Sequence, residues 1–222
     1  MLSKRKQPSD FTDPACVKLQ KTDCPYLGQI NRSVLDFDFE KVCSISLQKD
    51  FNIYCCLACG LYFRGKGVGT EAYIHSLETT GHNVFINLQN ASIYCLPDNY
   101  EVFDASLNDI KQNLRPVFSK DISVLKTPST NLDGHKFWPG FVGLNNLIGT
   151  DYINVVIHAI TKIDPIVKHC LFSKTPSGGK NKSFIELVKK IWNPKNLKGQ
   201  VCPHEFSQAV SLASDKKFKI GE

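Results

Sequence analysis

The order of hydrophobic and polar residues in the first half of the chain predicts short strands. Hydrophobic and polar positions alternate along Phe51-Asn-Ile-Tyr-Cys55, and this period of two is typical of a half-buried strand. Apolar runs at 83–88 and 92–96 predict two more strands, and Ala72-Tyr-Ile-His75 favours a helix. Pro97 and the Asp and Asn after it predict a turn, because Pro fixes one backbone angle and Asp or Asn bonds its own backbone. Together these elements predict a small α+β module.

A helical period dominates the second half of the chain. Apolar residues at i, i+3 and i+7 predict a helix at 106–114, and a longer one is predicted at 151–163. The capping box Ser183-Phe-Ile-Glu186 predicts the start of a third helix, and Pro203 the start of a fourth. The helix at 151–163 carries one apolar stripe that we expect to be core: Tyr152, Val155, Val156, Ala159, Ile160 and Ile163.

These patterns divide the chain into four segments. Residues 1–22 have few large apolar residues and no periodicity, so we expect a disordered basic tail. Residues 23–116 hold the α+β module, and residues 117–136 are rich in turn residues and are interpreted as a linker. Residues 137–222 are expected to form a second, mainly helical domain. The predicted fold class is therefore α+β.

The composition excludes a membrane protein and indicates a reducing compartment. Of the 222 residues, 42% are hydrophobic and 22% are charged, as in ordinary soluble domains. No apolar run approaches the roughly 20 residues that a membrane-spanning helix needs. The N-terminus lacks the apolar core of a signal peptide, so we expect the nine cysteines to be metal ligands or buried thiols.

The net charge of +6 lies at the two ends of the chain. Residues 1–22 carry +3 and residues 180–222 carry +5, so the middle of the chain is slightly acidic. This argues against a module that grips phosphates, because nonspecific nucleic-acid affinity comes mainly from Lys and Arg. Direct contact with RNA stays open. Lys4-Arg5-Lys6 fits a nuclear import signal and a solvated basic tail equally well.

Four residues of the first module have the chemistry of a zinc site. Cys56 and Cys59 are separated by two residues, so both thiols can point at one ion, and His75 and His82 can complete a tetrahedron. The spacing of the two histidines is longer than in short nucleic-acid fingers. We interpret the set as a structural zinc site. The alternative is two buried thiols and two ordinary histidines.

Two stretches of the chain resemble the ubiquitin-specific protease family. Cys24-Pro-Tyr-Leu, the zinc motif and Tyr94-Cys-Leu-Pro-Asp-Asn-Tyr100 resemble that family's zinc finger. Gly143-Leu-Asn-Asn-Leu-Ile-Gly-Thr-Asp-Tyr-Ile-Asn154 resembles the cysteine box that opens its catalytic domain. The resemblance implies a degenerate zinc finger at 23–116, followed by the first part of a papain-like protease domain, of the kind called the thumb.

The match is closer to the non-catalytic, splicing-factor branch of the family, through Ile30–Lys41 and Ile191-Trp-Asn-Pro-Lys195. This implies a nuclear protein that supports assembly or stability of the spliceosomal tri-snRNP and contacts its proteins. The remainder of the protease-like domain is absent here. The sequence leaves open whether the chain is a fragment or the product of a short gene.

The resemblance also implies that the chain is not an enzyme. Asp151 stands where the family has its nucleophilic cysteine, and a carboxylate cannot replace a thiolate in amide cleavage. Asn146 stands at the position that stabilises the oxyanion, but without a nucleophile there is no oxyanion to stabilise. We therefore expect a pseudo-deubiquitinase.

Ubiquitin binding by the finger is the alternative function. Ubiquitin-binding members carry Cys-Gly-Arg where this chain has Arg64-Gly-Lys66, and that arginine helps to hold the C-terminal carboxylate of ubiquitin. Lysine lacks the planar two-pronged donor of arginine, which disfavours this function. A second family zinc site is eroded: Cys24 and Cys43 remain, but Tyr26 and Ser46 stand at the companion positions. Whether these two cysteines hold a metal is open.

Overall fold

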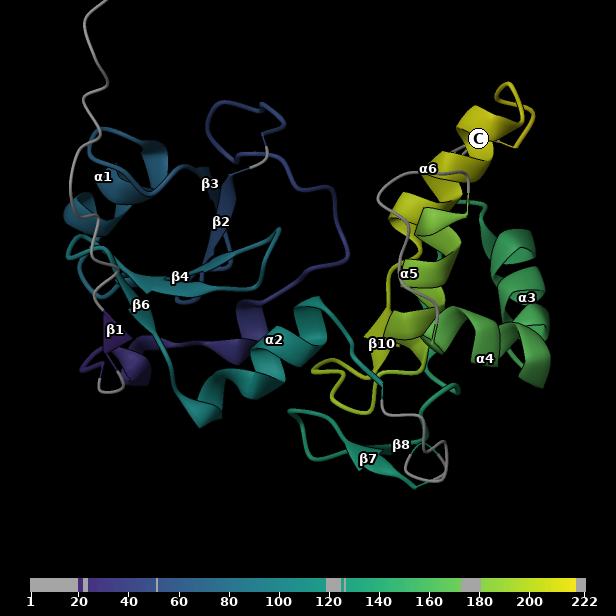
Figure 1. The fold of residues 1–222 in the computed structure, drawn as a ribbon. Coiled ribbons are helices and arrows are strands. Elements are labelled where there is room, and N and C mark those ends of the chain that lie inside the picture. The colour runs from purple at the N-terminus through teal and green to yellow at the C-terminus, as the bar shows by residue number, and fades with distance from the viewer. Residues whose placement is uncertain are drawn as a thin grey trace, which may run out of the picture.

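The computed structural model describes residues 20–21, 24–50, 52–118, 125, 127–172 and 181–218. They form two lobes side by side (Figure 1). We call residues 20–118 the finger lobe and residues 125–218 the helical lobe. Of the predicted N-terminal tail, Gln20 and Lys21 form a short strand, and the rest lies outside the described residues.

The finger lobe is built on a six-stranded sheet in the order β1-β6-β5-β4-β2-β3. β1 pairs parallel with β6, and the other neighbours are antiparallel. The predicted strands near 51–55, 83–88 and 92–96 appear as β2, β4 and β5. The strands are β1 Gln20–Lys21, β2 Ile53–Cys56, β3 Tyr62–Arg64, β4 Val84–Asn87, β5 Ile93–Cys95 and β6 Tyr100–Val102.

A helix covers each face of this sheet. Successive side chains of a strand point to opposite faces, so the sheet contributes residues to two cores. One face carries the larger core, where helix α2, Asn108–Leu114, packs through Ile110 and Leu114. The opposite face carries a smaller core, where helix α1, Glu71–Glu78, packs through Ala72. Along β2 the first core takes Ile53 and Cys55, and the second takes Tyr54 and Cys56.

Four helices form the helical lobe, around two apolar cores that share Trp192. Strands β7 and β8 form a small hairpin, and β9 and β10 pair in parallel. β7 falls within the range predicted as a linker, and the division into domains stays a prediction. The elements are β7 Ser129–Thr130, β8 Lys136–Phe137, β9 Gly143–Leu144, α3 Asp151–Ile160, α4 Asp164–Phe172, α5 Lys182–Ile191, β10 Gln200–Val201 and α6 His204–Ala213.

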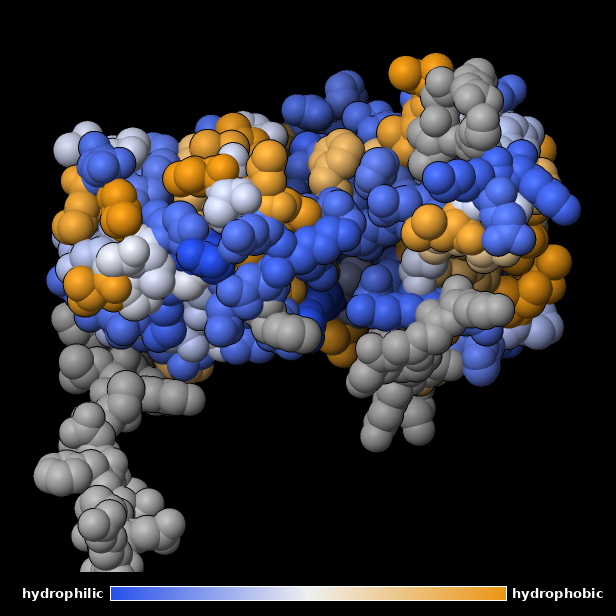
Figure 2. Space-filling view, turned by 90° about the horizontal axis from the view of Figure 1, so that it is seen from above, coloured by the Kyte–Doolittle hydropathy of each residue, from blue (hydrophilic) through white to orange (hydrophobic). Residues whose placement is uncertain are grey.

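The prediction that the stripe from Tyr152 to Ile163 forms the core face of α3 is wrong. Ile153 and Ile157 are the buried residues, at 7% and 1% exposure, whereas Val155 and Val156 are 69% and 54% exposed. The physical reason is that α3 is apolar around most of its circumference, so periodicity alone cannot choose which side faces the core. Figure 2 shows hydrophobic side chains along the right edge of the molecule, the side on which α3 lies in Figure 1.

A separate helix follows closely after α3. Asp164 and Pro165 begin α4, where proline fits because the first helical turn needs no N–H donor. The predicted capping box is wrong, because Ser183 lies inside α5, and Asn181 is the N-cap and makes no side-chain capping bond. The prediction of a mixed α+β fold is confirmed.

Candidate metal centre

Three elements of the finger lobe bring the metal-type residues together. Cys56 ends β2, and a tight turn, closed by the bond from Gly60 N to Cys56 O at 2.8 Å, returns the chain past Cys59. Gly60 has a positive φ of 78°, which glycine adopts without strain. His75 projects from α1, and His82 lies in the turn that leads into β4.

The side-chain donors of these four residues converge on one point. Their ligand atoms all lie within 4.8 Å of one another. The Sγ of Cys56 is 3.6 Å from Nδ1 of His82, and the Sγ of Cys59 is 3.6 Å from Nε2 of His75. Zinc bonds of roughly 2.3 Å to sulfur and 2.0–2.1 Å to nitrogen put tetrahedral S and N ligands about 3.5 Å apart. The donor set and its spacing therefore fit zinc.

Packing and hydrogen bonds prepare these side chains for a cation. The ring of His75 stacks on Phe63 with the two ring centroids 4.2 Å apart, which limits its rotation. A hydrogen bond with the Cys56 thiol lowers the pKa of Cys59 to about 5, and bonds with both histidines act in the same direction. The same thiol–thiol bond and burial raise the pKa of Cys56. One thiolate is thus stabilised by the protein, and a bound dication would stabilise the second.

The structure places Asp151 and Asn146 in the helical lobe, away from this cluster. Asp151 is the exposed first residue of α3, where a carboxylate is favoured by the partial positive charge of the helix N-terminus. Asn146 turns its amide oxygen inward, where it accepts from Thr150 N at 3.1 Å and from the Thr150 hydroxyl at 3.2 Å. In this loop the amide thus holds the start of α3.

The residues that replace the family's ubiquitin-binding motif are bound by their own chain. Arg64 pairs with Glu71, with Nη2 3.2 Å from the carboxylate, and also donates to Gln48 at 2.8 Å. Lys66 donates to Asn99 Oδ1 at 2.8 Å, and its ammonium lies 3.9 Å from the centroid of the Tyr94 ring. Both cations are therefore already engaged within the finger lobe.

The two cysteines of the eroded second site have other neighbours. The Tyr100 hydroxyl donates to the Sγ of Cys24 at 3.3 Å. Burial raises the pKa of Cys95 to about 12, and the adjacent Cys24 thiol acts in the same direction. Burial would raise the pKa of Cys43, but hydrogen bonds from Ser46 and its neighbours lower it overall. Sequence reasoning missed Cys95 as a neighbour of Cys24, although the stretch Tyr94–Tyr100 contains it.

Within the described residues, the cluster of Cys56, Cys59, His75 and His82 is the one group of three or more Cys, His, Asp or Glu side chains with metal-site geometry. All eight described cysteines are free thiols. Across the same residues, no helix has the length and apolar character needed to cross a membrane.

Comparison with known proteins identifies the class of the molecule. Residues 42–107 match the family model of the Zn-finger in ubiquitin-hydrolases and other proteins. The chain is 47% identical over 211 residues to the human ubiquitin carboxyl-terminal hydrolase 39. The aligned region covers 89% of this chain and 37% of the relative. It therefore belongs to the ubiquitin-hydrolase family that carries this zinc finger, and the predicted family and zinc cofactor are confirmed.

Other relatives of the chain carry names from pre-mRNA splicing. The chain is 33% identical over 213 residues to the pre-mRNA-splicing factor SAD1 of Saccharomyces cerevisiae, covering 92% of this chain and 47% of the relative. A crystal structure of an essential yeast splicing factor superimposes with a TM-score of 0.79 at 33% identity, over 86% of this chain and 49% of that one. The chain thus spans less than half the length of each of these relatives.

Proposed function

We propose that the chain is a non-catalytic, zinc-containing interaction protein of pre-mRNA splicing. It acts in the nucleus and supports assembly or stability of the tri-snRNP through protein contacts. The observation that carries this proposal is the superposition at a TM-score of 0.79 on a yeast splicing factor, which extends through both lobes. The name of the yeast relative SAD1 points to the same process.

Cys56, Cys59, His75 and His82 are the proposed zinc ligands. Four protein ligands in a tetrahedron leave no open position for water or substrate, which is the arrangement of structural zinc sites. Such zinc stabilises the fold directly, because its binding free energy is available only when the ligands are assembled. The metal therefore fixes the relative positions of β2, α1 and the start of β4, which together form the surface that a partner binds.

The absence of catalysis rests on Asp151. This carboxylate stands at the position of the family's nucleophile, is exposed, and begins α3. A carboxylate attacking an amide would give a mixed anhydride that returns to reactants faster than it proceeds. The expected result is that the full chain releases no fluorophore from a ubiquitin C-terminal substrate. Cleavage above a no-protein control would contradict this part of the proposal.

Engagement of Lys66 with Asn99 and Tyr94 supports weak or absent ubiquitin binding. Removing Lys66 from these partners would cost their hydrogen bond and the attraction between the cation and the ring. Calorimetric titration with free ubiquitin tests this point. A dissociation constant in the low micromolar range would favour the alternative function, a ubiquitin-binding adaptor without protease activity.

The splicing proposal is tested by co-purification. A tagged full chain added to nuclear extract should recover the snRNAs of the tri-snRNP, measured by quantitative reverse transcription. A matched chain carrying Cys56→Ser and Cys59→Ser should recover them at background, because the finger loses its metal. Equal recovery by both chains, or none by either, would contradict the proposal.

A further inference from the structure

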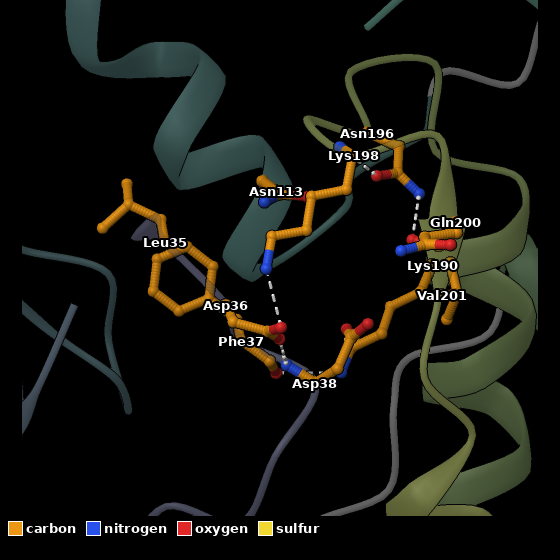
Figure 3. A pocket seen from close by; sticks show the side chains of 10 residues that line it. All are labelled: Leu35, Asp36, Phe37, Asp38, Asn113, Lys190, Asn196, Lys198, Gln200 and Val201. Atoms are coloured by element: carbon orange, nitrogen blue, oxygen red, sulfur yellow. Dashed lines mark hydrogen bonds and ion pairs between the residues drawn. The ribbon is translucent and has the colours of Figure 1, made fainter. Parts of the chain in front are cut away.

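A polar seam joins the two lobes. On the finger side it is made by the segment 31–38, which we call the bridging segment. Lys198 Nζ lies 2.8 Å from Asp36 Oδ2, and Lys190 Nζ lies 3.1 Å from Asp38 Oδ1. Figure 3 shows the ammonium of Lys198 meeting the carboxylate of Asp36 at the edge of a small pocket, with Lys190 and Val201 on the opposite wall from Leu35 and Phe37.

Further contacts fix the bridging segment to the helical lobe. Lys190 also donates to the carbonyl of Phe37 at 3.0 Å, and the backbone N of Cys202 donates to Asp38 Oδ2 at 2.8 Å. The side chains of Lys190 and Asp38 are only 15% and 21% exposed, so this pair is shielded from water and salt. Asp38 therefore binds both α5 and the residue after β10.

Apolar packing crosses the same seam. Leu197 belongs to the helical lobe by sequence, yet it is 5% exposed and lies in the larger core of the finger lobe. Asn193, in the same loop between α5 and β10, donates to the carbonyl of Gln112 at 3.4 Å. The loop at 193–198 thus completes a core whose other members lie at 24–114.

The opposite side of the bridging segment touches the turn that carries the cysteines. Asn31 N donates to the carbonyl of Leu57, between Cys56 and Cys59, at 2.9 Å. A methyl group at Gly60 would lie 2.5 Å from the carbonyl oxygen of Val34, closer than any side chain tolerates. Glycine at 60 therefore lets the cysteine turn and the bridging segment approach each other.

We propose that the zinc site and the helical lobe are coupled through the bridging segment. Zinc fixes the cysteine turn, the turn positions residues 31–34, and residues 35–38 then present their carboxylates and carbonyl to Lys190, Lys198 and Cys202. Metal binding in one lobe thereby sets the position of the other. The inference rests on the zinc ligation proposed above.

Hydrogen exchange of the full chain, with zinc and after chelation, tests the coupling. Chelation should accelerate exchange in residues 31–38 and 190–202 by at least about tenfold. Residues 164–172 of α4 serve as internal reference, since no described hydrogen bond or ion pair joins them to the finger lobe, and they should change less than about twofold. Unchanged exchange at 190–202, or equal acceleration in α4 through global unfolding, would overturn the proposal.

Charge exchange across the seam tests the path with zinc in place. Asp36→Lys should accelerate exchange at 190–202 without loss of metal, and the double variant Asp36→Lys with Lys198→Asp should restore slow exchange. Lys217→Met, at an exposed lysine outside the seam, is the matched control. No acceleration in the single variant, or no recovery in the double variant, would count against the path.

Metal analysis of the same samples separates the two proposals. A chain that purifies without zinc contradicts the proposed ligation, and Gly60→Ala then decides the coupling alone. The added methyl must displace Val34, so exchange at 190–202 should rise in this variant with or without metal. Wild-type exchange in Gly60→Ala would overturn the coupling.

Discussion

The imidazole of His75 stacks on the ring of Phe63, with the two ring centroids 4.2 Å apart and the ring planes inclined by 23°. Phe63 is 2% exposed and lies on β3, so a rigid strand holds the histidine in the orientation that points Nε2 at Cys59. The aromatic ring therefore acts on the metal site without donating to the metal.

We predict that Phe63→Leu weakens zinc binding about tenfold, since loss of an outer contact that orients a ligand typically costs 10–100-fold in affinity. Competition with a chromophoric chelator measures the effect. Phe103→Leu is the matched control, because Phe103 lies in the same lobe and is 41% exposed. Equal zinc affinity in both variants would show that the stack does not orient His75.

Two cysteines four residues apart, Cys55 on β2 and Cys59 in the turn that follows it, give the sharpest test of the ligand set. Cys59→Ser should reduce bound zinc from about one per chain to near zero and unfold the finger lobe, because structural zinc supplies folding free energy. Cys55→Ser should keep the metal, since Cys55 lies in the core on the opposite face of the sheet from Cys56. Elemental analysis and far-UV circular dichroism measure both. Metal retained in Cys59→Ser would refute the assignment.

The partly buried carboxyl of Glu205 should make the stability of the protein depend on pH. Burial raises the pKa of this carboxyl, although Lys190 and Lys41 oppose the shift, and Glu186 and Asp38 add to it. The folded state therefore favours the protonated form, and this stabilisation is complete below the unfolded pKa of about 4.3 and lost as the pH rises through the folded pKa.

Glu205→Gln should accordingly raise the melting temperature at pH 7 and change it much less near pH 4, where most of the glutamate is protonated in both states. Thermal unfolding at the two pH values measures the difference. Glu78→Gln, an exposed glutamate at the end of α1, provides the control and should show no such pH dependence. A lower melting temperature for Glu205→Gln at pH 7 would mean that the attraction to the two lysines outweighs burial.

Local signals in the sequence predicted the finger lobe well. Strand periodicity located β2 and β4, and the spacing of two cysteines and two histidines selected the residues whose ligand atoms the fold brings within 4.8 Å of one another. Each of these signals comes from residues close together in the chain, where geometry follows directly from spacing.

The seam between the lobes could not be predicted in this way. Asp38 and Lys190 lie in different lobes, and nothing in the sequence distinguishes either of them from an ordinary solvent-exposed charge. Leu197 likewise reads as a loop residue, although it completes the finger core. Such pairings depend on tertiary packing, which leaves no periodic trace in one sequence.

Helix α3 shows the same limit inside a single element. Its apolar residues satisfy two different stripes, one through Ile153 and Ile157 and one through Val155 and Val156, and only the packing of the lobe decides between them. Ile157 is 1% exposed and Val155 is 69% exposed. The two positions should therefore respond very differently to the same loss of side-chain volume.

Ile157→Ala is expected to lower the free energy of unfolding by about 2–4 kcal/mol, because it removes buried methyl groups and leaves a cavity. Val155→Ala should change it by less than about 0.5 kcal/mol, as for other exposed substitutions. Chemical denaturation of the full chain measures both, and repetition at two protein concentrations separates folding from self-association. If Val155→Ala costs as much as Ile157→Ala at both concentrations, the outer face of α3 is covered within the chain itself, and the assignment of its buried side is wrong.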